Sequence, residues 1–394
     1  MRKDSAFIKI LILFVLIFSP LQTYSQEITI KGLQWLTSVQ KPDGFWGDLN
    51  GPIFRNTTVV ADTFQILEPT STVYFTALEW LAIQDPANYD YISRRIYTLS
   101  NTSYNFSLDL NNLISGQNSD GGWGLYTDHE SDPLTTTLAL QSFRAINYTD
   151  WSVLSSALNY LTGTQNPDSG WGFYQGDRGN VYMTAVVLET LSEYKGVYYL
   201  EIPINKAVDY LRLRQNPDGG FGDYGLSNVI DTSMALMALI ESGEGQALPL
   251  QRAVNYLLNS QLPDGSWDGD AYTTALALRA LHSAQPNLTV ASSDITYARA
   301  GSGITIAATI HNTGAQSASN VLVRFYDGDP MAGGVQIDGD QSIASIAAGG
   351  EATVQVAWDV SVVYGIHEIY KIIIDNIIYC DRNWDNRVKG VEEC

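Results

Sequence analysis

The amino-acid sequence predicts a multi-domain chain in which an all-α repeat domain precedes an all-β sandwich. A short turn motif recurs five times, and its last four copies begin at Gln117, Gln165, Gln215 and Gln261, which are 48, 50 and 46 residues apart. Recurrence at this period indicates one structural unit that is stacked repeatedly. After Pro286 the composition changes to short runs rich in β-branched residues, which indicates strands.

Each copy of the motif is a Gln, a short polar turn and an aromatic residue. The five copies are 40–46, 117–123, 165–171, 215–221 and 261–267. Most copies contain a Pro, which cannot continue the preceding helix, and a Gly, which supplies the positive φ that closes the turn. The motif therefore marks the end of one helix in every unit.

Helices are predicted on both sides of the turn. The segments 157–165 and 253–261 have apolar residues at helical spacing and precede a turn, whereas 135–143, 182–191, 231–239 and 273–281 follow a turn and are apolar on most sides. Upstream, 28–39 pairs with 56–67 and 77–84 with 91–99. This pattern predicts six helix pairs, about twelve helices, which can close into a ring with the second helices inside.

The Gln and the aromatic residue that recur at the two ends of the motif have a structural interpretation. A Gln at a helix end can satisfy backbone groups of the turn, and the aromatic ring can pack over the next helix pair. An alternative is that the aromatic residues line a substrate site. The positions concerned are Gln40, Trp46, Gln117, Trp123, Gln165, Trp171, Gln215, Phe221, Gln261 and Trp267.

The order of helix, Gln, Asp-Gly-Gly-Trp turn and Thr-Ala-Leu-Ala-Leu helix resembles the repeat of the prenyltransferase and squalene-cyclase superfamily, including the QW motif of triterpene cyclases. The resemblance covers roughly residues 28–285. It implies an (α/α)6 toroid, which we place at 26–285, and it says much less about activity.

None of the catalytic sets that the resemblance implies is present. Triterpene cyclases take their proton from an Asp-x-Asp-Asp-Thr-Ala segment, but the nearest match, 228–233, has Ile230 in the donor position. The prenyltransferase zinc site needs Asp, Cys and His, and the repeats contain no Cys; the Gly-Cys-Gly-Glu-Gln thioester stretch is also absent. The four His residues have no ligand spacing. The sequence therefore predicts no catalytic residue.

A ligand site remains a possible use of the ring. We expect acidic residues at the N-terminal ends of the inner helices, where they would cap free amides and complement the helix dipole. Alternatively, some of them, with Tyr182, face the mouth of the toroid and bind a ligand. These candidates are Asp62, Asp132, Asp231, Asp270 and Tyr182.

Residues 286–379 are predicted to form the β-sandwich, with strands at 288–291, 304–310, 321–326, 352–358 and 368–374. The stretches 310–314, 323–328 and 346–358 resemble the CARDB family of bacterial and archaeal surface proteins. That resemblance implies an immunoglobulin-like module used for adhesion or spacing, in a prokaryotic extracellular or periplasmic protein.

The acidic tail, 380–394, is bounded by Cys380 and Cys394, which either form a disulfide with each other or are free or partnered elsewhere. Oxygen-bearing side chains lie at positions 1, 3, 5 and 12 of a calcium-type loop, although Asn386 replaces the usual turn Gly. The ligands would be Asp381, Asn383, Asp385 and Glu392. Calcium is the one cofactor that the sequence suggests, and an acidic end to the last strand is the alternative.

Residues 1–25 are predicted to be a signal peptide, with Arg2 and Lys3 before an apolar run from Ile8 to Phe18. The processed chain is then not an integral membrane protein and is secreted, periplasmic or at the cell surface. A net charge of -20 argues against nucleic acid as a partner.

Together these features predict a secreted or cell-surface, non-catalytic binding or scaffold protein with a spacer sandwich. Its partner would be an extracellular protein, a glycan or a hydrophobic small molecule. The alternative is a divergent terpene cyclase or prenyltransferase-class enzyme that acts on a polyprenyl substrate.

Overall fold

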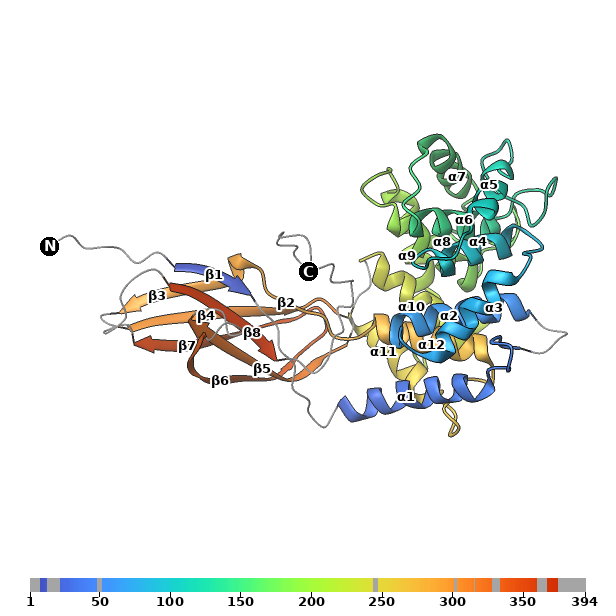
Figure 1. The fold of residues 1–394 in the computed structure, drawn as a ribbon. Helices are drawn as coiled ribbons and strands as arrows, with labels where there is room; N and C mark the ends of the chain where they lie inside the picture. The colour runs from blue at the N-terminus through green and yellow to red at the C-terminus, as the bar shows by residue number, and fades with distance from the viewer. Residues whose placement is uncertain are drawn as a thin grey trace. The chain divides into compact units, whose positions relative to one another are not determined.

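The computed structural model describes residues 8–12, 22–47, 52–243, 247–300, 303–314, 316–327, 334–359 and 367–374 (Figure 1). The chain divides into a helical unit, Gln26–Ala284, and a second unit formed by the segments before and after it. The predicted disulfide, Cys380 with Cys394, and the predicted calcium loop, 381–392, lie outside the described residues.

The helical unit is the predicted toroid, in which outer and inner helices alternate along the chain. The outer helices are α1 (Gln22–Val39), α3 (Thr72–Ile83), α5 (Ser107–Ser115), α7 (Trp151–Gly163), α9 (Glu201–Arg212) and α11 (Ala247–Asn259). The inner helices are α2 (Ile53–Leu67), α4 (Tyr89–Leu99), α6 (Pro133–Ala145), α8 (Val181–Glu193), α10 (Val229–Glu241) and α12 (Ala271–Ser283).

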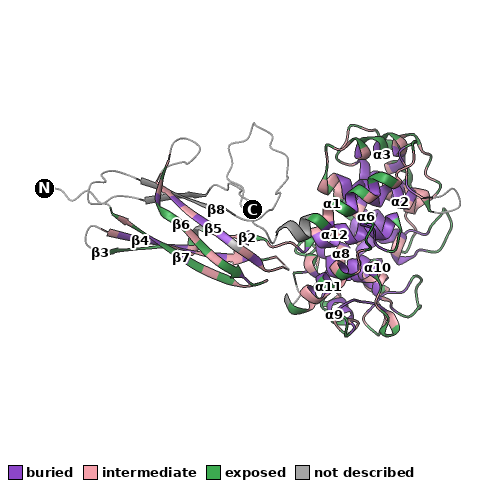
Figure 2. Cartoon of the chain, turned by 90° about the horizontal axis from the view of Figure 1, so that it is seen from below, coloured by how far each residue is buried: buried purple, intermediate pink, exposed green. Residues whose placement is uncertain are grey.

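The inner helices form a closed ring. Each one contacts the next in the order α2, α4, α6, α8, α10 and α12, and α12 contacts α2 again. The hydroxyl of Thr63 on α2 also donates to the carbonyl of Ala275 on α12, at 3.3 Å. The inner helices are mostly buried (Figure 2), as expected for helices covered by both the outer ring and their neighbours.

The Gln of each turn motif joins neighbouring repeats. Its Nε2 group donates to a carbonyl of its own turn and to a carbonyl in the next outer helix along the ring. In four copies the second acceptor belongs to the repeat that follows, at Val73, Val153, Pro203 and Pro249. In the last copy, Gln261 donates to Ile28 of α1 at 2.9 Å, so it closes the outer ring onto its first helix.

The Trp of each motif ties the turn to its own helix pair. Its Nε1 donates to a carbonyl at the end of the preceding outer helix, and its backbone N–H donates to a Thr hydroxyl of the following inner helix. The Nε1 bonds join Trp46 to Leu36, Trp123 to Leu113, Trp171 to Leu161 and Trp267 to Leu257, at 2.7–2.8 Å. All four indole rings are fully buried, so they act here as packing elements.

We expect Gln261→Ala to destabilise the toroid by about 2 kcal/mol, because it leaves two carbonyls, of Ile28 and Gly265, without this donor. Urea unfolding of the full chain measures the change. Gln84→Ala is the matched control, since the Gln84 amide donates only within its own helix, to Trp80. Equal losses in the two variants would contradict a ring-closing role.

The second unit contains two four-stranded sheets. One has the order β1 (Ile8–Ile12), β8 (His367–Ile374), β5 (Ala318–Asp327) and β6 (Val335–Ile346). The other joins β2 (Leu288–Thr289), β4 (Gly303–Asn312) and β3 (Ile295–Ala300), with β7 (Glu351–Asp359) on the free side of β4. Alternate residues of β4 and β5, such as Ile306 and Val323, fill the core.

Besides β1, two of these strands, β3 and β6, are missing from the sequence-based prediction. Both contain polar and exposed positions, and the exposed Tyr297 of β3 illustrates why their β-branched signal is weak. Strand β1 pairs in parallel with β8, Ile8 opposite His367. It lies within the predicted signal peptide, whose removal stays a prediction.

Candidate functional site

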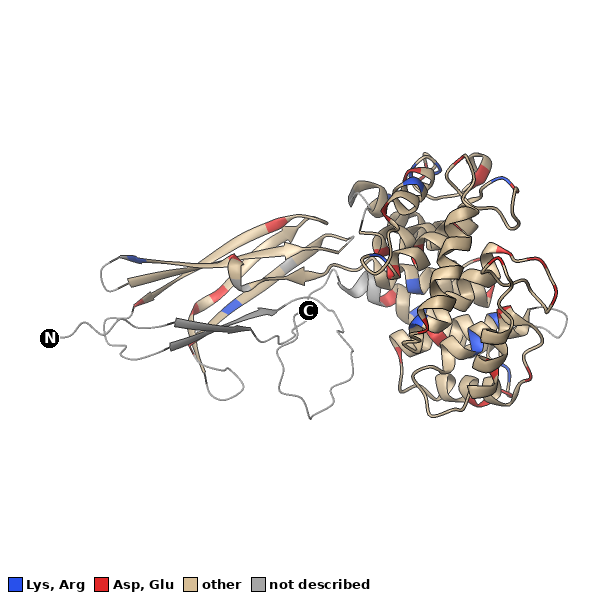
Figure 3. Ribbon diagram, turned by 90° about the horizontal axis from the view of Figure 1, so that it is seen from above, with Lys and Arg blue, Asp and Glu red and all other residues tan. Residues whose placement is uncertain are grey.

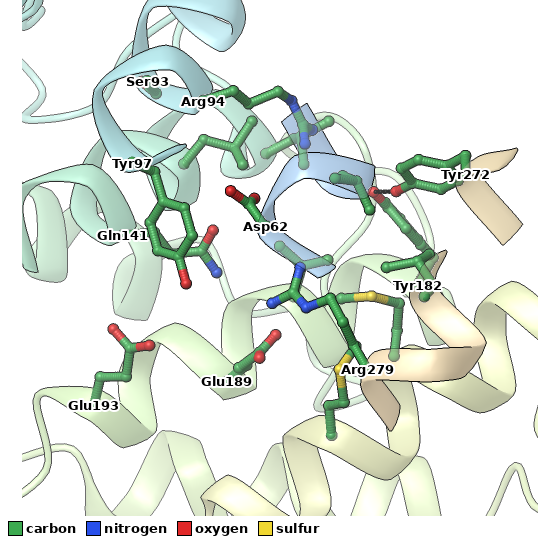
Figure 4. A pocket seen from close by; sticks show the side chains of 17 residues that line it. Asp62, Ser93, Arg94, Tyr97, Gln141, Tyr182, Glu189, Glu193, Tyr272 and Arg279 are labelled. Atoms are coloured by element: carbon green, nitrogen blue, oxygen red, sulfur yellow. Dashed lines mark hydrogen bonds between the residues drawn. The ribbon is translucent and has the colours of Figure 1, made fainter. Parts of the chain in front are cut away.

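The inner helices enclose an axial cavity with a volume of about 80 Å³ (Figure 4). A water molecule needs roughly 10–15 Å³ of such space, so the cavity holds only a few waters with the side chains in these positions. All six inner helices contribute to its wall.

The lining follows from helical periodicity. On α8 the lining residues are Tyr182, Val186, Glu189 and Glu193, whose spacing of four, three and four places them on one face. On α12, Tyr272, Leu276 and Arg279 repeat that spacing. The two helices therefore line the cavity with residues at corresponding turns.

Equivalent turns form two layers of opposite character. The first layer is mostly apolar and consists of Val59, Leu138, Val186, Met234 and Leu276, with Ser93 and Arg94 at the equivalent turn of α4. The second layer, one turn further along the helices, is mostly polar or charged and consists of Asp62, Tyr97, Gln141, Glu189, Met237 and Arg279. The cavity is thus amphipathic along the axis of the toroid.

Asp62 is the most informative residue of the polar layer. Its side chain is buried and points into the cavity (Figure 4), and its Oδ1 atom has no hydrogen-bond partner among the described residues. Burial raises the pKa of Asp62 from 3.8 to about 6, against the opposing effects of Arg279, of the Thr98 hydroxyl and of Arg94. A carboxyl group in this state can donate a proton near neutral pH.

Charges of both signs share the cavity with Asp62. The guanidinium of Arg279 makes no hydrogen bond or ion pair with the described residues, and it interacts over longer distance with Tyr97, Asp62 and Glu189. Burial raises the pKa of Glu189, which Arg279 partly offsets. These interactions, in spite of burial, keep the pKa of Arg279 above its ordinary value.

Glu193 stands at the end of α8, where burial and then the charges of Glu189 and Glu241 raise its pKa to about 8. The folded state therefore holds a proton on Glu193 between pH ~4.5 and 8 that the unfolded state has released, so stability falls as pH rises through this window. We expect Glu193→Gln to flatten the fall and to stabilise the chain at pH 8 by about 2 kcal/mol.

Thermal unfolding of both proteins from pH 4 to 9 measures this effect. Glu201→Gln, which changes an exposed carboxyl at the start of α9, should leave the slope unchanged. A wild-type melting temperature that does not decrease between pH 5 and 8 would exclude the buried, protonated state of Glu193.

The opposite side of the cavity is more tightly bonded. Arg94 pairs with Asp90 at 2.6 Å, and although burial opposes its charge, Asp90 and the neighbouring tyrosines keep the pKa of Arg94 above its ordinary value. The hydroxyls of Tyr182 and Tyr272 are 3.0 Å apart, joined by a hydrogen bond. The free hydrogen-bonding groups therefore concentrate around Asp62, Glu189 and Arg279.

The structure separates the five ligand candidates named from the sequence. Asp132 and Asp270 are N-caps of α6 and α12, and their carboxylates accept from the backbone N–H of Thr135 and Thr273. Asp231 lies in the first turn of α10, bonded to Asn228, and does not line the cavity. Tyr182 and Asp62 do line it.

The placement of Asp62 at the N-terminal end of an inner helix was wrong. It is the tenth residue of α2, which begins at Ile53. The first motif, 40–46, precedes α2, but the loop between motif and inner helix differs in length from repeat to repeat, so the start of α2 could not be assigned from the sequence. The error matters because a mid-helix position puts the carboxyl in the polar layer of the cavity.

Most polar lining residues were missed, namely Ser93, Arg94, Tyr97, Gln141, Glu189, Glu193, Tyr272 and Arg279. A signal was available, since Arg279 interrupts the apolar run Ala271–Leu281 and Glu189 interrupts Val181–Leu191 at the same turn. A lone charge in a helix that is otherwise apolar on all sides faces either a partner or a cavity.

The described residues contain neither a metal-binding cluster nor a membrane-spanning helix. Their His, Cys, Asp and Glu side chains include no group of three that is placed to hold a metal ion. In the same part of the chain, no helix combines the length and apolar character needed to span a bilayer.

Comparison with known families bears directly on this architecture. Residues 127–280 match the model of the squalene-hopene cyclase C-terminal domain, and residues 285–377 match the CARDB model. The chain joins a squalene-cyclase-like domain to a CARDB domain. The cyclase-like domain contributes the cavity, and the CARDB domain is the β-sandwich. No match was found among curated protein sequences.

Solved structures with a similar fold include type II terpene cyclases. The apo enzyme MstE from Scytonema superposes with a TM-score of 0.55 at 16% identity, over 66% of this chain and 98% of that enzyme. A variant of MstE in complex with geranylgeranyl dihydroxybenzoate, its substrate, gives 0.54 at 15% identity, over 66% and 97%.

A protein from Actinoplanes gives a TM-score of 0.52 at 16% identity, over 65% of this chain and 98% of that protein. At these identities the likeness shows that the cyclase-like domain shares the terpene-cyclase fold. The chemistry has to be argued from the residues in the cavity.

Proposed function

We propose that the cyclase-like domain is a divergent, acid-initiated enzyme of the terpene-cyclase class, with Asp62 as the proton donor. The observation that carries this proposal is a buried carboxyl with a raised pKa and one oxygen, Oδ1, that has no hydrogen-bond partner among the described residues, pointing into the axial cavity of a cyclase-type toroid. This reverses the leading interpretation of the sequence and adopts its alternative.

The proposed chemistry is an isomerisation. Transfer of the Asp62 proton to a terminal alkene would give a carbocation, ring closure would consume further double bonds, and loss of a proton would end the reaction. The rings of Tyr97 and Tyr182 line the same space and can stabilise the cation through their π faces. Glu189 is a second carboxyl that can accept the final proton.

The site differs from the Asp-x-Asp-Asp arrangement in a chemically important way. The charged side chains that affect Asp62 are Arg279 and Arg94. Both favour its ionised form, and a guanidinium opposes a nearby carbocation. A substrate with an anionic group that binds Arg279 would remove this opposition, because it would neutralise the cation nearest Asp62.

A second candidate function, non-catalytic binding, is favoured by the size of the cavity. About 80 Å³ suits a small polar ligand, and an isoprenoid enters only if flexible lining residues such as Met234 and Met237 move. In that case the CARDB domain would space or attach a binding module.

Turnover assays separate the two functions. The purified chain is incubated with farnesyl and geranylgeranyl compounds, with and without a carboxylate group, and the products are analysed by mass spectrometry. A product with the mass of the substrate and fewer double bonds supports the enzyme. Saturable binding of a small polar ligand, with every isoprenoid recovered unchanged, would replace it with the binding module.

We also propose that the chain is exported, because the CARDB match and the charged and apolar N-terminal segment agree on that destination. The expected mature protein begins at Gln26. N-terminal sequencing of the protein exported by a bacterial expression host tests this. An intact Met1 in the exported fraction would contradict cleavage.

A further inference from the structure

The loops that follow two consecutive turn motifs enclose a second hollow, which we call the inter-repeat cleft. It lies between residues 173–180 of the third copy and 213–225 of the fourth, and its volume is about 440 Å³. That is within the range of about 300–1,000 Å³ found for small-molecule sites. It shares no lining residue with the axial cavity.

Two exposed aromatic rings form walls of this cleft. Tyr224 is 85% exposed, and its φ of 57° lies in the left-handed region, which is rare for a bulky residue. Phe173 is 48% exposed, and one face of its ring stacks against Tyr182 at 6.3 Å. Both rings line the cleft, so their exposed faces are available to a ligand there.

The polar groups of the cleft are planar and are partly fixed in position. The guanidinium of Arg214 lies 3.7 Å from the centre of the Tyr210 ring and 3.6 Å from Asp223, whose other oxygen accepts from the backbone N–H of Val181. The side-chain oxygen of Asn180 caps α8, and its amide nitrogen makes no hydrogen bond among the residues that the structure describes.

Arg178 also lines the cleft. Its guanidinium lies over the ring of Tyr224, 5.7 Å from the centre of the ring. Among the described residues it makes no ion pair or hydrogen bond, so its donors are available to a ligand. With Arg214, Asp177 and Asp223 the cleft contains two positive and two negative side chains, and Figure 3 shows residues of both signs on the surrounding unit.

This combination defines a ligand class. Balanced charge gives no net attraction to an anion or a cation. Guanidinium, carboxylate and amide groups each offer paired hydrogen-bonding atoms, which match neighbouring hydroxyls. An exposed aromatic ring offers its face to aliphatic C–H groups. We propose that the inter-repeat cleft binds a neutral oligosaccharide, stacked on Tyr224 and hydrogen-bonded by Arg178 and Asn180.

Isothermal titration of the full chain with cello-, manno- and xylo-oligosaccharides tests the proposal, alongside oligogalacturonate and inorganic phosphate as anionic probes. We expect saturable binding of at least one neutral oligosaccharide, weakened tenfold or more by Tyr224→Ala. Tyr199→Ala is the control, because Tyr199 is 95% exposed but lies outside the cleft, and it should leave the affinity unchanged.

Three results would overturn the proposal: no binding of any neutral oligosaccharide, binding of the anionic probes alone, or equal affinity in the wild type and Tyr224→Ala. Arg178→Ala guards against a folding defect at Tyr224, since it removes an exposed side chain and should also weaken binding. Asp62→Asn should retain full oligosaccharide affinity, so failure of the enzyme proposal and failure of this one are separable.

Discussion

Replacing Asp62 with Asn is expected to lower turnover of an isoprenoid substrate by at least a hundredfold. The amide keeps the shape of the side chain in the cavity but cannot donate a carboxyl proton, and general acids contribute about 10²–10⁴ to rate. Substrate affinity should change little, because the two side chains occupy the same volume. The measurement is kcat and KM for both proteins with the substrate identified in the turnover screen.

The dependence of wild-type activity on pH should reflect the titration of the Asp62 carboxyl. The reaction needs the protonated carboxyl, whose pKa is about 6, so kcat/KM should fall as pH rises above 6. Stability should move in the same direction, since the folded state retains this proton between pH ~4 and 6 and the unfolded state releases it. A pKa raised from 3.8 to about 6 corresponds to roughly 3 kcal/mol.

Asp62→Asn should therefore remove this part of the pH dependence and should be more stable than the wild type at pH 7. Asp231→Asn is the matched control, because Asp231 lies on α10 outside the cavity lining. If Asp231→Asn abolished turnover while Asp62→Asn retained it, the proton donor would be misassigned.

The largest loss of stability is expected for Trp267→Ala, at about 4 kcal/mol. The indole is fully buried, and its Nε1 donates to the carbonyl of Leu257 at 2.8 Å. The substitution opens a large cavity and leaves that carbonyl without its donor, and buried Trp-to-Ala changes cost about 3–5 kcal/mol. Denaturant unfolding of the full chain, followed by circular dichroism, measures the loss.

Two matched variants identify the cause. Trp267→Phe keeps most of the packing and loses mainly the Nε1 bond, as in the fourth copy where Phe221 is native, so about 1–2 kcal/mol is expected. Trp151→Ala removes a ring that is 44% exposed and should cost less than 1 kcal/mol. A loss at Trp267→Ala no larger than at Trp151→Ala would rule out the packing role of the motif.

The helical architecture was predictable because its causes are local and repeated. A turn with Pro, Gly or both ends each outer helix by backbone geometry alone, and apolar periodicity identifies the helix that follows. The first two repeats were located less exactly, since the turn of the second lacks Gly and the loop between the first motif and α2 differs in length from the corresponding loops of other repeats. The strands β3 and β6 were missed because exposed polar positions weaken their pattern.

The site was predicted poorly for a related reason. Asp132 and Asp270 have strong sequence context, yet they use their carboxylates as caps within their own helices. Glu189 and Arg279 were overlooked because each is a single charge in an apolar run, and only the ring brings them together from helices 90 residues apart in the sequence (279 minus 189).

The sequence by itself determined the repeat unit, the count of helix pairs and the change to a sandwich after Pro286, because turn chemistry and hydrophobic periodicity act over a few residues. Only the tertiary structure decided which face of each inner helix borders the cavity, and therefore that Asp62 is buried with its Oδ1 unbonded among the described residues. Ring closure sets this rotation, since each helix turns its most apolar surface to its neighbours and leaves the remaining stripe to the axis.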